Sequence, residues 1–242
     1  MRFLNRFIAA LAVAAAPVAA DPVMFPAKDG VVVHADYQGK GGKSLILLFH
    51  QAGSNLHEYD PIVPRLHRLG FDTLAVSLRS GGSQFGGENE TANGVGGSPD
   101  YLQAYPDMEA ALNWAMTDAG AGSPRVIVWG SSYSSSLVFK LAAEHPDGVI
   151  GVLGFSPGEY FGSAFSVAKA AARVKAPIFV SSASDAGEVA AAKAILARVP
   201  GRAVQFTPKR GVHGSSTLRE DQNPAGVAEN WAAVEAFLAG LG

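Results

Sequence analysis

The stretch Val126–Leu137, VIVWGSSYSSSL, joins a run of apolar, mostly β-branched residues to a cluster of five serines. An apolar run of this kind predicts a buried strand, and the serines are a poor continuation of it. We therefore expect the strand to end in a sharp turn near Gly130. That turn is either an ordinary serine-rich loop or a device that holds one serine in a special geometry, and the residues elsewhere in the chain decide between the two.

The first twenty residues, MRFLNRFIAALAVAAAPVAA, carry two arginines ahead of an apolar run and end on small residues. These features are typical of a secretory signal peptide. The apolar stretch from Phe7 to Ala20 is shorter than the roughly 20 residues that a membrane span needs, so a retained transmembrane anchor is the weaker alternative. We expect cleavage after Ala20, a periplasmic or secreted product, and no stable membrane insertion of the mature protein.

The composition of the 242-residue chain excludes several classes of protein. A net charge of −2, which becomes more negative once the leader is removed, does not suggest binding to nucleic acid or to an anionic membrane. Because the chain has no cysteine, disulfide bonds and thiolate metal sites are excluded. With no linker-like segment and no internal repeat, residues 21–242 predict a single domain with one large core.

Alternating patterns predict the fold. Two short β-rich segments flank Lys28-Asp29-Gly30, and an Asp-Gly pair in this setting predicts an antiparallel hairpin. From Ser44 onward helical patterns separate the apolar runs SLILLFH, FDTLAVSL, RVIVWG, GVIGVLGFS, APIFVSS and RAVQFTP. Strands buried on both faces and separated by helices predict an α/β fold with a doubly wound, mainly parallel sheet. Ligands bind at the carboxyl ends of such strands, so the residues just after each run are the informative ones.

The serine cluster fits a known catalytic pattern at this position. Gly130–Ser134 matches G-x-S-x-G with a serine in place of the last glycine, and it lies between a predicted strand and a predicted helix, as a nucleophile elbow requires. The spacing selects Ser132 as the nucleophile. Small residues are needed two positions before and after it because the turn is tight, and Ser134 is small enough. The alternative is a serine-rich helix start with no catalytic role.

A serine hydroxyl needs a base, and the base needs a carboxylate to orient it. His213 follows the last predicted strand on a Gly-flanked loop and is the candidate base, with a solvated surface histidine as the alternative. Asp185 stands three residues past the strand APIFVSS and is the candidate acid. It could instead be the N-cap of the helix that follows, and Glu188 is a nearby substitute that falls inside that helix.

Acyl transfer also needs donors for the oxyanion that forms when the serine attacks a carbonyl group. One donor is expected to be the backbone N–H of Tyr133, directly after the nucleophile. The other is expected to be the N–H of Gln51, in the Gly-containing turn HQAGSN after the strand SLILLFH. We expect His50 to brace this turn through hydrogen bonds.

With Ser132, Asp185 and His213 in this order, each after a strand, the chain resembles the α/β-hydrolase superfamily, and more specifically compact bacterial serine esterases similar to the dienelactone hydrolase family. HQAG, LRSGG and YPDMEAALNWA also match, and the resemblance runs from about Val31 to Leu241. It implies acyl transfer to water, most often from small-molecule carboxylic esters, with no metal and no organic cofactor. Dienelactone hydrolases use a cysteine nucleophile, so their substrate is not carried over to a chain without cysteine.

The segment between Ser156 and Pro177 has room for a loop and one short helix, which predicts an open cleft with no large lid domain. Candidates for lining the cleft are Phe85, Glu159, Tyr160 and Phe161, although loop residues of these types are more often simply exposed.

Two questions stay open at this point. The Gly-rich loop from Arg79 to Pro99 is either a mobile cover for the site or a solvated excursion. The same triad serves an amidase or peptidase as well as an esterase, and a non-catalytic binding protein on a hydrolase scaffold is the alternative from another class.

Overall fold

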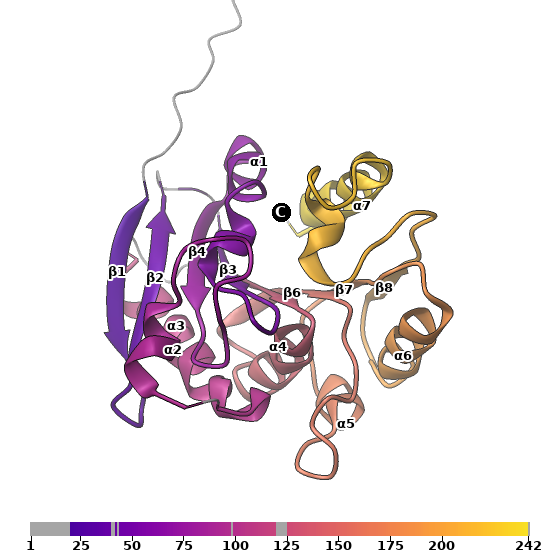
Figure 1. Cartoon of the computed structure of the whole chain (residues 1–242). Coiled ribbons are helices and arrows are strands. Elements are labelled where there is room, and N and C mark those ends of the chain that lie inside the picture. The colour runs from indigo at the N-terminus through magenta and orange to yellow at the C-terminus, as the bar shows by residue number, and fades with distance from the viewer. Residues whose placement is uncertain (1–19, 40–41, 43, 98, 120–124, 242) are drawn as a thin grey trace, which may run out of the picture.

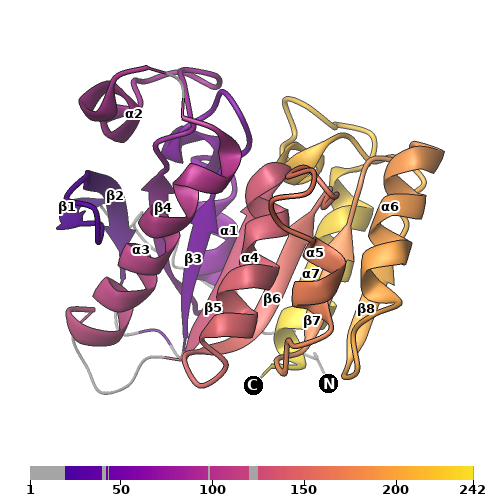
Figure 2. The same cartoon turned by 90° about the horizontal axis from the view of Figure 1, so that it is seen from below.

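The structure, a computed structural model, describes residues 20–39, 42, 44–97, 99–119 and 125–241. The predicted signal peptide falls on residues 1–20 and so lies, except for its last residue, outside the described residues. One sheet of eight strands crosses the molecule in the order β1-β2-β4-β3-β5-β6-β7-β8 (Figures 1 and 2). Its strands are β1 (Asp21–Pro26), β2 (Val32–Gln38), β3 (Leu45–Phe49), β4 (Asp72–Ser77), β5 (Val126–Ser131), β6 (Val149–Phe155), β7 (Ile178–Ser181) and β8 (Ala203–Phe206).

Helices connect most of the strands, as the alternating pattern predicts. The α-helices are α1 (Val63–Arg68), α2 (Glu90–Val95), α3 (Tyr105–Thr117), α4 (Tyr133–Glu144), α5 (Val167–Ala171), α6 (Ala186–Leu196) and α7 (Val227–Ala239). Three short 3₁₀ helices are η1 (Leu56–Tyr59), η2 (Tyr101–Ala104) and η3 (Gly214–Leu218). None of the helices in the described part of the chain is long and apolar enough to cross a membrane.

The sheet has the mixed character that the sequence predicts. β1 and β2 form an antiparallel hairpin around the turn at Asp29 and Gly30, whose φ of 86° suits a residue without a side chain. β2 pairs antiparallel with β4, and every pairing from β4 to β8 is parallel. The predicted doubly wound α/β fold with an N-terminal antiparallel hairpin is therefore confirmed.

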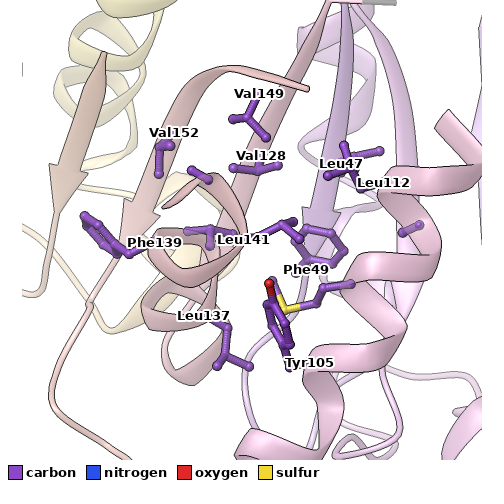
Figure 3. Packing of buried hydrophobic residues seen from close by; sticks show 14 of the residues in the cluster. Leu47, Phe49, Tyr105, Leu112, Val128, Leu137, Phe139, Leu141, Val149 and Val152 are labelled. Carbon is purple, nitrogen blue, oxygen red and sulfur yellow. The ribbon is translucent and has the colours of Figure 1, made fainter. Parts of the chain in front are cut away.

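Both faces of the sheet are buried, because successive side chains of each strand point to opposite sides. In β3, Leu47 and Phe49 face one hydrophobic cluster and Leu48 faces the other. Helices α3, α4, α5 and α6 cover the first face, and α1 and α7 cover the second (Figure 2). Figure 3 shows the first cluster, where side chains of α3 and α4 pack against β3, β5 and β6.

The order of strands places the site. Chain order reverses where β3 lies between β4 and β5, and ligands bind at the carboxyl ends of the strands next to such a switch point. The loops after β3, β5, β6, β7 and β8 therefore open on the same edge of the sheet.

The loop between Arg79 and Pro99 is held against the protein. The Asn55 side-chain amide donates to the carbonyl oxygens of Gly82 and Gly86, at 2.9 and 3.0 Å. The Gln84 N–H donates to Gly53 at 2.9 Å, and α2 lies inside the loop. These contacts show that the first part of the loop is folded against the turn after β3, while most of its described residues are exposed.

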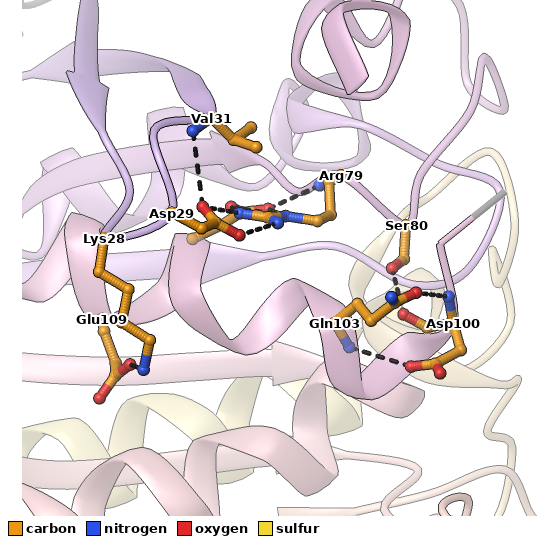
Figure 4. Close-up of polar contacts among 9 residues, drawn as sticks. Lys28, Asp29, Val31, Arg79, Ser80, Asp100, Gln103 and Glu109 are labelled. Carbon is orange, nitrogen blue, oxygen red and sulfur yellow. Dashed lines mark hydrogen bonds and ion pairs between the residues drawn. The ribbon is translucent and has the colours of Figure 1, made fainter. Parts of the chain in front are cut away.

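A buried ion network ties the hairpin, the start of this loop and α3 together (Figure 4). The Arg79 guanidinium forms ion pairs with Asp29 and with Asp107, whose side chain is completely buried. Asp107 also accepts a hydrogen bond from the Arg79 N–H at 2.8 Å. Burial raises the pKa of Asp107, and its hydrogen bonds with Arg79 oppose that rise. The Arg79 guanidinium thus compensates the negative charge of the buried Asp107 carboxylate.

We expect Arg79→Met to lower the free energy of unfolding by about 3 to 5 kcal/mol, because it leaves Asp107 buried without its partner. Urea unfolding at pH 7 measures this loss. The matched control is Lys28→Met, which removes the exposed ion pair with Glu109 and should cost less than about 1 kcal/mol (Figure 4). Equal losses in the two variants would contradict the assignment of Arg79 to a buried network.

Candidate active site

Ser132 occupies a sharp turn between β5 and α4. Its backbone angles, φ 58° and ψ −122°, lie in a region that residues other than glycine rarely adopt, as a nucleophile elbow requires. Gly130 is needed here because a Cβ atom at this position would lie 2.5 Å from backbone atoms of Ser134 and Ser135. The predicted elbow is therefore present, and Ser132 is the residue at its apex.

Ser134, which departs from the glycine of the pattern, fastens the elbow to a neighbouring strand. Its hydroxyl group accepts a hydrogen bond from the Ser131 N–H at 2.9 Å and donates to the Phe49 carbonyl oxygen at 2.7 Å. Phe49 ends β3, so this side chain joins the elbow to the strand that leads into the expected oxyanion loop. A glycine could not make this connection.

His213 lies on the loop after β8 and reaches the elbow. Its Nε2 atom is 2.8 Å from the Ser132 Oγ, and its Nδ1 atom is 2.8 Å from Oε1 of Glu188. Because an ionised carboxylate only accepts hydrogen bonds, Nδ1 carries the proton and Nε2 is free to accept from the serine hydroxyl. The structure thus brings together the predicted serine and the predicted histidine in the orientation of a nucleophile and its base.

The acid expected at Asp185 is wrong, because the carboxylate beside His213 belongs to Glu188. Asp185 is the N-cap of α6 and accepts hydrogen bonds from the N–H groups of Gly187 and Glu188, at 2.8 and 3.2 Å. Side chains in a helix tilt toward its N-terminus, so the longer Glu188 side chain in the first turn points back to the strand end. The short Asp185 side chain is occupied by the helix end.

The two ionisable groups of this pair shift each other's pKa. Burial opposes the ionisation of Glu188, but hydrogen bonds with His213, Ser156 and the Ala183 N–H outweigh it and lower its pKa to about 2. The same hydrogen bond with Glu188 raises the pKa of His213, against a smaller effect of burial. Glu188 is therefore charged at neutral pH and favours the protonated form of the histidine.

Ser156, directly after β6, supports this pair. It is one of three non-glycine residues with positive φ in the described part of the chain, at 57°. Its hydroxyl group accepts a hydrogen bond from the Gly214 N–H at 2.9 Å and interacts with Glu188. Since Gly214 follows His213 in the chain, Ser156 holds both the histidine loop and the carboxylate. No sequence motif indicated a role for Ser156, and its position directly after a predicted strand was the one signal that could have done so.

The expected donor at Gln51 is also wrong, because the Gln51 N–H donates to Oε2 of Glu58 at 2.8 Å. Among the described residues, the next N–H in the turn, that of Ala52, has no hydrogen-bond partner. His50 braces the turn as expected, donating from Nδ1 to the Gln51 carbonyl and accepting the Leu78 N–H at Nε2. Burial lowers the pKa of His50 to about 4, so it is neutral. Ala52 thus has the unpaired N–H in this turn, and the N–H of Tyr133 opens α4 and has no intrahelical partner.

Glu58, a residue that the sequence analysis missed, lies buried beneath the site. Besides the Gln51 N–H, it accepts a hydrogen bond from the Ser131 hydroxyl at 2.6 Å. That hydroxyl in turn accepts the Ser215 N–H at 2.8 Å. One carboxyl therefore links the turn after β3, the end of β5 and the loop that carries His213. The only sequence signal was a charged residue within the segment LHEYDPIV, which the fold buries.

The four residues expected to line the cleft have different positions. Tyr160 and Phe161 border one pocket, together with Tyr101. Glu159 instead caps α5, accepting the N–H groups of two residues in its first turn at 2.8 Å each. Phe85 packs beneath the Arg219 guanidinium, 4.2 Å from the ring centre. Tyr160 and Phe161 thus border a pocket, whereas Glu159 has a structural role.

No three His, Asp or Glu side chains gather as a metal site would require anywhere in the described ranges of the chain.

Glu58→Gln should change the pH dependence of stability. Burial raises the pKa of Glu58 from 4.5 to about 7, with hydrogen bonds from Ser131 and Gln51 opposing the rise. The folded state thus keeps a proton that the unfolded chain releases, so Glu58 contributes stability at low pH that is lost as the pH rises toward 7. Between pH 5 and pH 8 the parent protein should lose on the order of 2 kcal/mol more than Glu58→Gln.

Denaturant unfolding of both proteins at the two pH values measures this difference. Glu220→Gln, which changes an exposed carboxylate, is the control and should follow the parent. The same pH dependence in Glu58→Gln and in the parent would show that Glu58 does not hold a proton in the folded state.

Solved structures of known proteins share this fold. An esterase of Pyrococcus furiosus, Pf2001, superposes with a TM-score of 0.70 at 19% identity, over 93% of this chain and 94% of that chain. A dienelactone hydrolase of Anabaena variabilis superposes with a TM-score of 0.69 at 19% identity, over 90% of this chain and 96% of that chain. Est1E of Butyrivibrio proteoclasticus, solved with ferulic acid bound, superposes with a TM-score of 0.71 at 13% identity, over 90% of this chain and 99% of that chain. Among curated proteins no sequence matches.

Residues 44–222, more than half of the chain, match the model of the alpha/beta hydrolase fold family, and this match covers the elbow, the histidine and the carboxylate described above. The chain belongs to the α/β-hydrolase family.

Proposed function

We propose that this protein hydrolyses carboxylic esters through an acyl-enzyme on Ser132. The observation that carries the proposal is the continuous line of hydrogen bonds from Ser132 through His213 to Glu188. These residues follow β5, β8 and β7, and the segments that carry them begin at one edge of the sheet. Nucleophile, base and orienting carboxylate within hydrogen-bond distance form the arrangement that serine hydrolases use.

The first half of the reaction follows from this geometry. As the Ser132 Oγ attacks the ester carbonyl carbon, its proton passes to Nε2 of His213, and Glu188 stabilises the resulting imidazolium. The carbonyl oxygen becomes an oxyanion that accepts hydrogen bonds from the backbone N–H groups of Tyr133 and Ala52. When the tetrahedral intermediate collapses, the bond to the alcohol breaks and His213 returns the proton to the departing oxygen.

The second half repeats these steps with water. His213 takes a proton from a water molecule, which attacks the acyl carbon, and the same two N–H groups stabilise the new oxyanion. Collapse releases the carboxylic acid and restores the Ser132 hydroxyl. An exposed fraction of 43% for the His213 side chain leaves room for water to approach it.

Two features support esters as the substrate class. The similar solved structures are named as esterases and dienelactone hydrolases. The connection between β6 and β7 holds only the short helix α5, so small esters can reach Ser132 without a separate domain having to open.

We expect a fluorophosphonate to label Ser132, because its hydroxyl group lies beside both the base and the oxyanion donors. Intact-mass measurement should show one adduct in the parent and none in Ser132→Ala. Ser136→Ala is the control from the same serine cluster, since its hydroxyl group bonds to the Gly158 backbone, away from the elbow. Labelling that survives Ser132→Ala would refute the proposed nucleophile.

Replacing the two neighbouring acids separates their roles. Glu188→Gln removes the charge that stabilises the imidazolium, and the corresponding change in other triads lowers kcat on the order of 10⁴-fold. Asp185→Asn keeps an N-cap of equal quality, so kcat should change by only about two-fold. Both rates are measured with an activated ester after circular dichroism confirms folding. A large loss of kcat in Asp185→Asn together with near-parent kcat in Glu188→Gln would overturn the assignment of Glu188 as the carboxylate that orients His213.

The pH profile gives a second readout for Glu188. Only neutral His213 can accept the serine proton, so kcat/KM falls as the pH drops through the pKa of the histidine. The hydrogen bond with Glu188 raises that pKa, so the acid limb of the parent should lie above pH 6.5. In Glu188→Gln the residual activity should have its acid limb at lower pH.

A further inference from the structure

We propose that the ester substrate carries a single uncharged aromatic ring, and that this ring binds in a pocket between η2 and the turn after β6. This inference rests on the proposed hydrolysis at Ser132 and adds the substrate class. The pocket, called the aromatic pocket below, has a volume of about 210 Å³ and is lined by Asp100, Tyr101, Leu102, Tyr160, Phe161 and Ala164.

Two walls of the aromatic pocket adjoin the nucleophile. The Tyr160 hydroxyl donates to the Ser156 carbonyl oxygen at 2.8 Å and also interacts with the Ser132 side chain. The Tyr101 ring stacks on Tyr133, the residue directly after Ser132, with 4.6 Å between ring centres and 16° between planes. The wall formed by Tyr160 therefore contacts the side chain that attacks the ester, and the wall formed by Tyr101 contacts its chain neighbour.

Size and chemistry favour one aromatic ring. A cavity of about 150 Å³ lined by apolar side chains is known to hold benzene, so the aromatic pocket has room for a ring with short substituents. Tyr101 and Tyr160 are each 40% exposed, which leaves part of their surface open to a ligand. Aromatic rings prefer offset or edge-to-face contact with other rings, and three of the six lining residues offer it.

The walls are held in place before any ligand binds. Asp100 and Gln103 form a capping box at the start of η2, and the Ser80 hydroxyl donates to the Asp100 carbonyl oxygen at 2.7 Å (Figure 4). In the turn after β6, the Phe161 ring makes an edge-to-face contact with the Phe165 ring, with 5.6 Å between ring centres. A preformed pocket avoids the entropy cost of ordering its walls on binding, which strengthens selection for a rigid, planar group.

The charge of the pocket excludes an anionic ring. The Asp100 side chain belongs to the lining, and Glu188 adds a second carboxylate close to Tyr160. No Lys, Arg or His is among the six lining residues. Glu188 is paired with His213, but a ring that bears a carboxylate would meet Asp100 with no cation in the lining to compensate, so we expect an uncharged ring.

Paired substrates test this inference on both sides of the ester bond. For the acyl side, methyl 3-phenylpropanoate is compared with methyl 3-cyclohexylpropanoate, and for the alcohol side, benzyl acetate with cyclohexylmethyl acetate. The two members of each pair have similar size, so the ratio of their kcat/KM values reports aromatic contact. In one of the pairs the parent should favour the aromatic ester about 3- to 10-fold, and a para-carboxylate on that ring should abolish the preference.

Variants locate the preference. Phe161→Ala and Tyr101→Ala should each bring the ratio close to 1. Val204→Ala, an exposed apolar position on β8 outside the pocket, is the control and should keep the parent ratio. Ratios near 1 in both pairs for the parent, or a preference that survives both pocket variants, would overturn the inference. Failure of the proposed hydrolysis is distinguished by the absence of both ester turnover and fluorophosphonate labelling of Ser132.

Discussion

The sharp turn at Ser132 is the constraint on which the whole site depends. A positive φ at a residue other than glycine costs on the order of 1 to 3 kcal/mol and persists only where the surroundings determine it. Here the surroundings are hydrogen bonds. Ser134 fastens the turn to β3, Glu58 holds the Ser131 hydroxyl, and the Ser132 N–H donates to the Phe155 carbonyl at 2.8 Å. The sheet, buried on both faces, is the rigid frame that carries these bonds.

Two carboxyl groups near this turn have opposite properties because their surroundings differ. Glu188 is partly exposed and accepts several hydrogen bonds, which lower its pKa to about 2, while burial raises that of Glu58 to about 7. Pairs of acids whose pKa values are pushed apart take different roles. Glu188 stays charged beside His213. Ionised Glu58 raises the pKa of His213 further, and burial, which favours the protonated form of Glu58, limits that effect.

Much of this site was predictable from the chain, and the parts that were not have physical reasons. Apolar runs gave the strands, and because ligand-binding residues follow strands in a parallel sheet, His213 could be selected by position. The acid could not be selected in this way, since Asp185 and Glu188 lie within one helical turn of each other in the segment after β7, and only the helix cap decides which one is free. The expected donor at Gln51 failed for a different reason. Its N–H is taken by Glu58, seven residues away, through a burial that no local pattern reveals.

The connection between β6 and β7 is short and leaves the proposed substrate recognition to short segments at the edge of the sheet. Between residues 156 and 177, all of them described, the chain forms only a turn and α5. Ser156 serves both sides of this turn, because its carbonyl oxygen accepts the Tyr160 hydroxyl and its own hydroxyl accepts the Gly214 N–H. One strained residue thus joins a wall of the aromatic pocket to the loop that carries His213. A change that reshapes the pocket here also acts on the histidine, so substrate selection and catalytic geometry are coupled through the backbone in this compact fold.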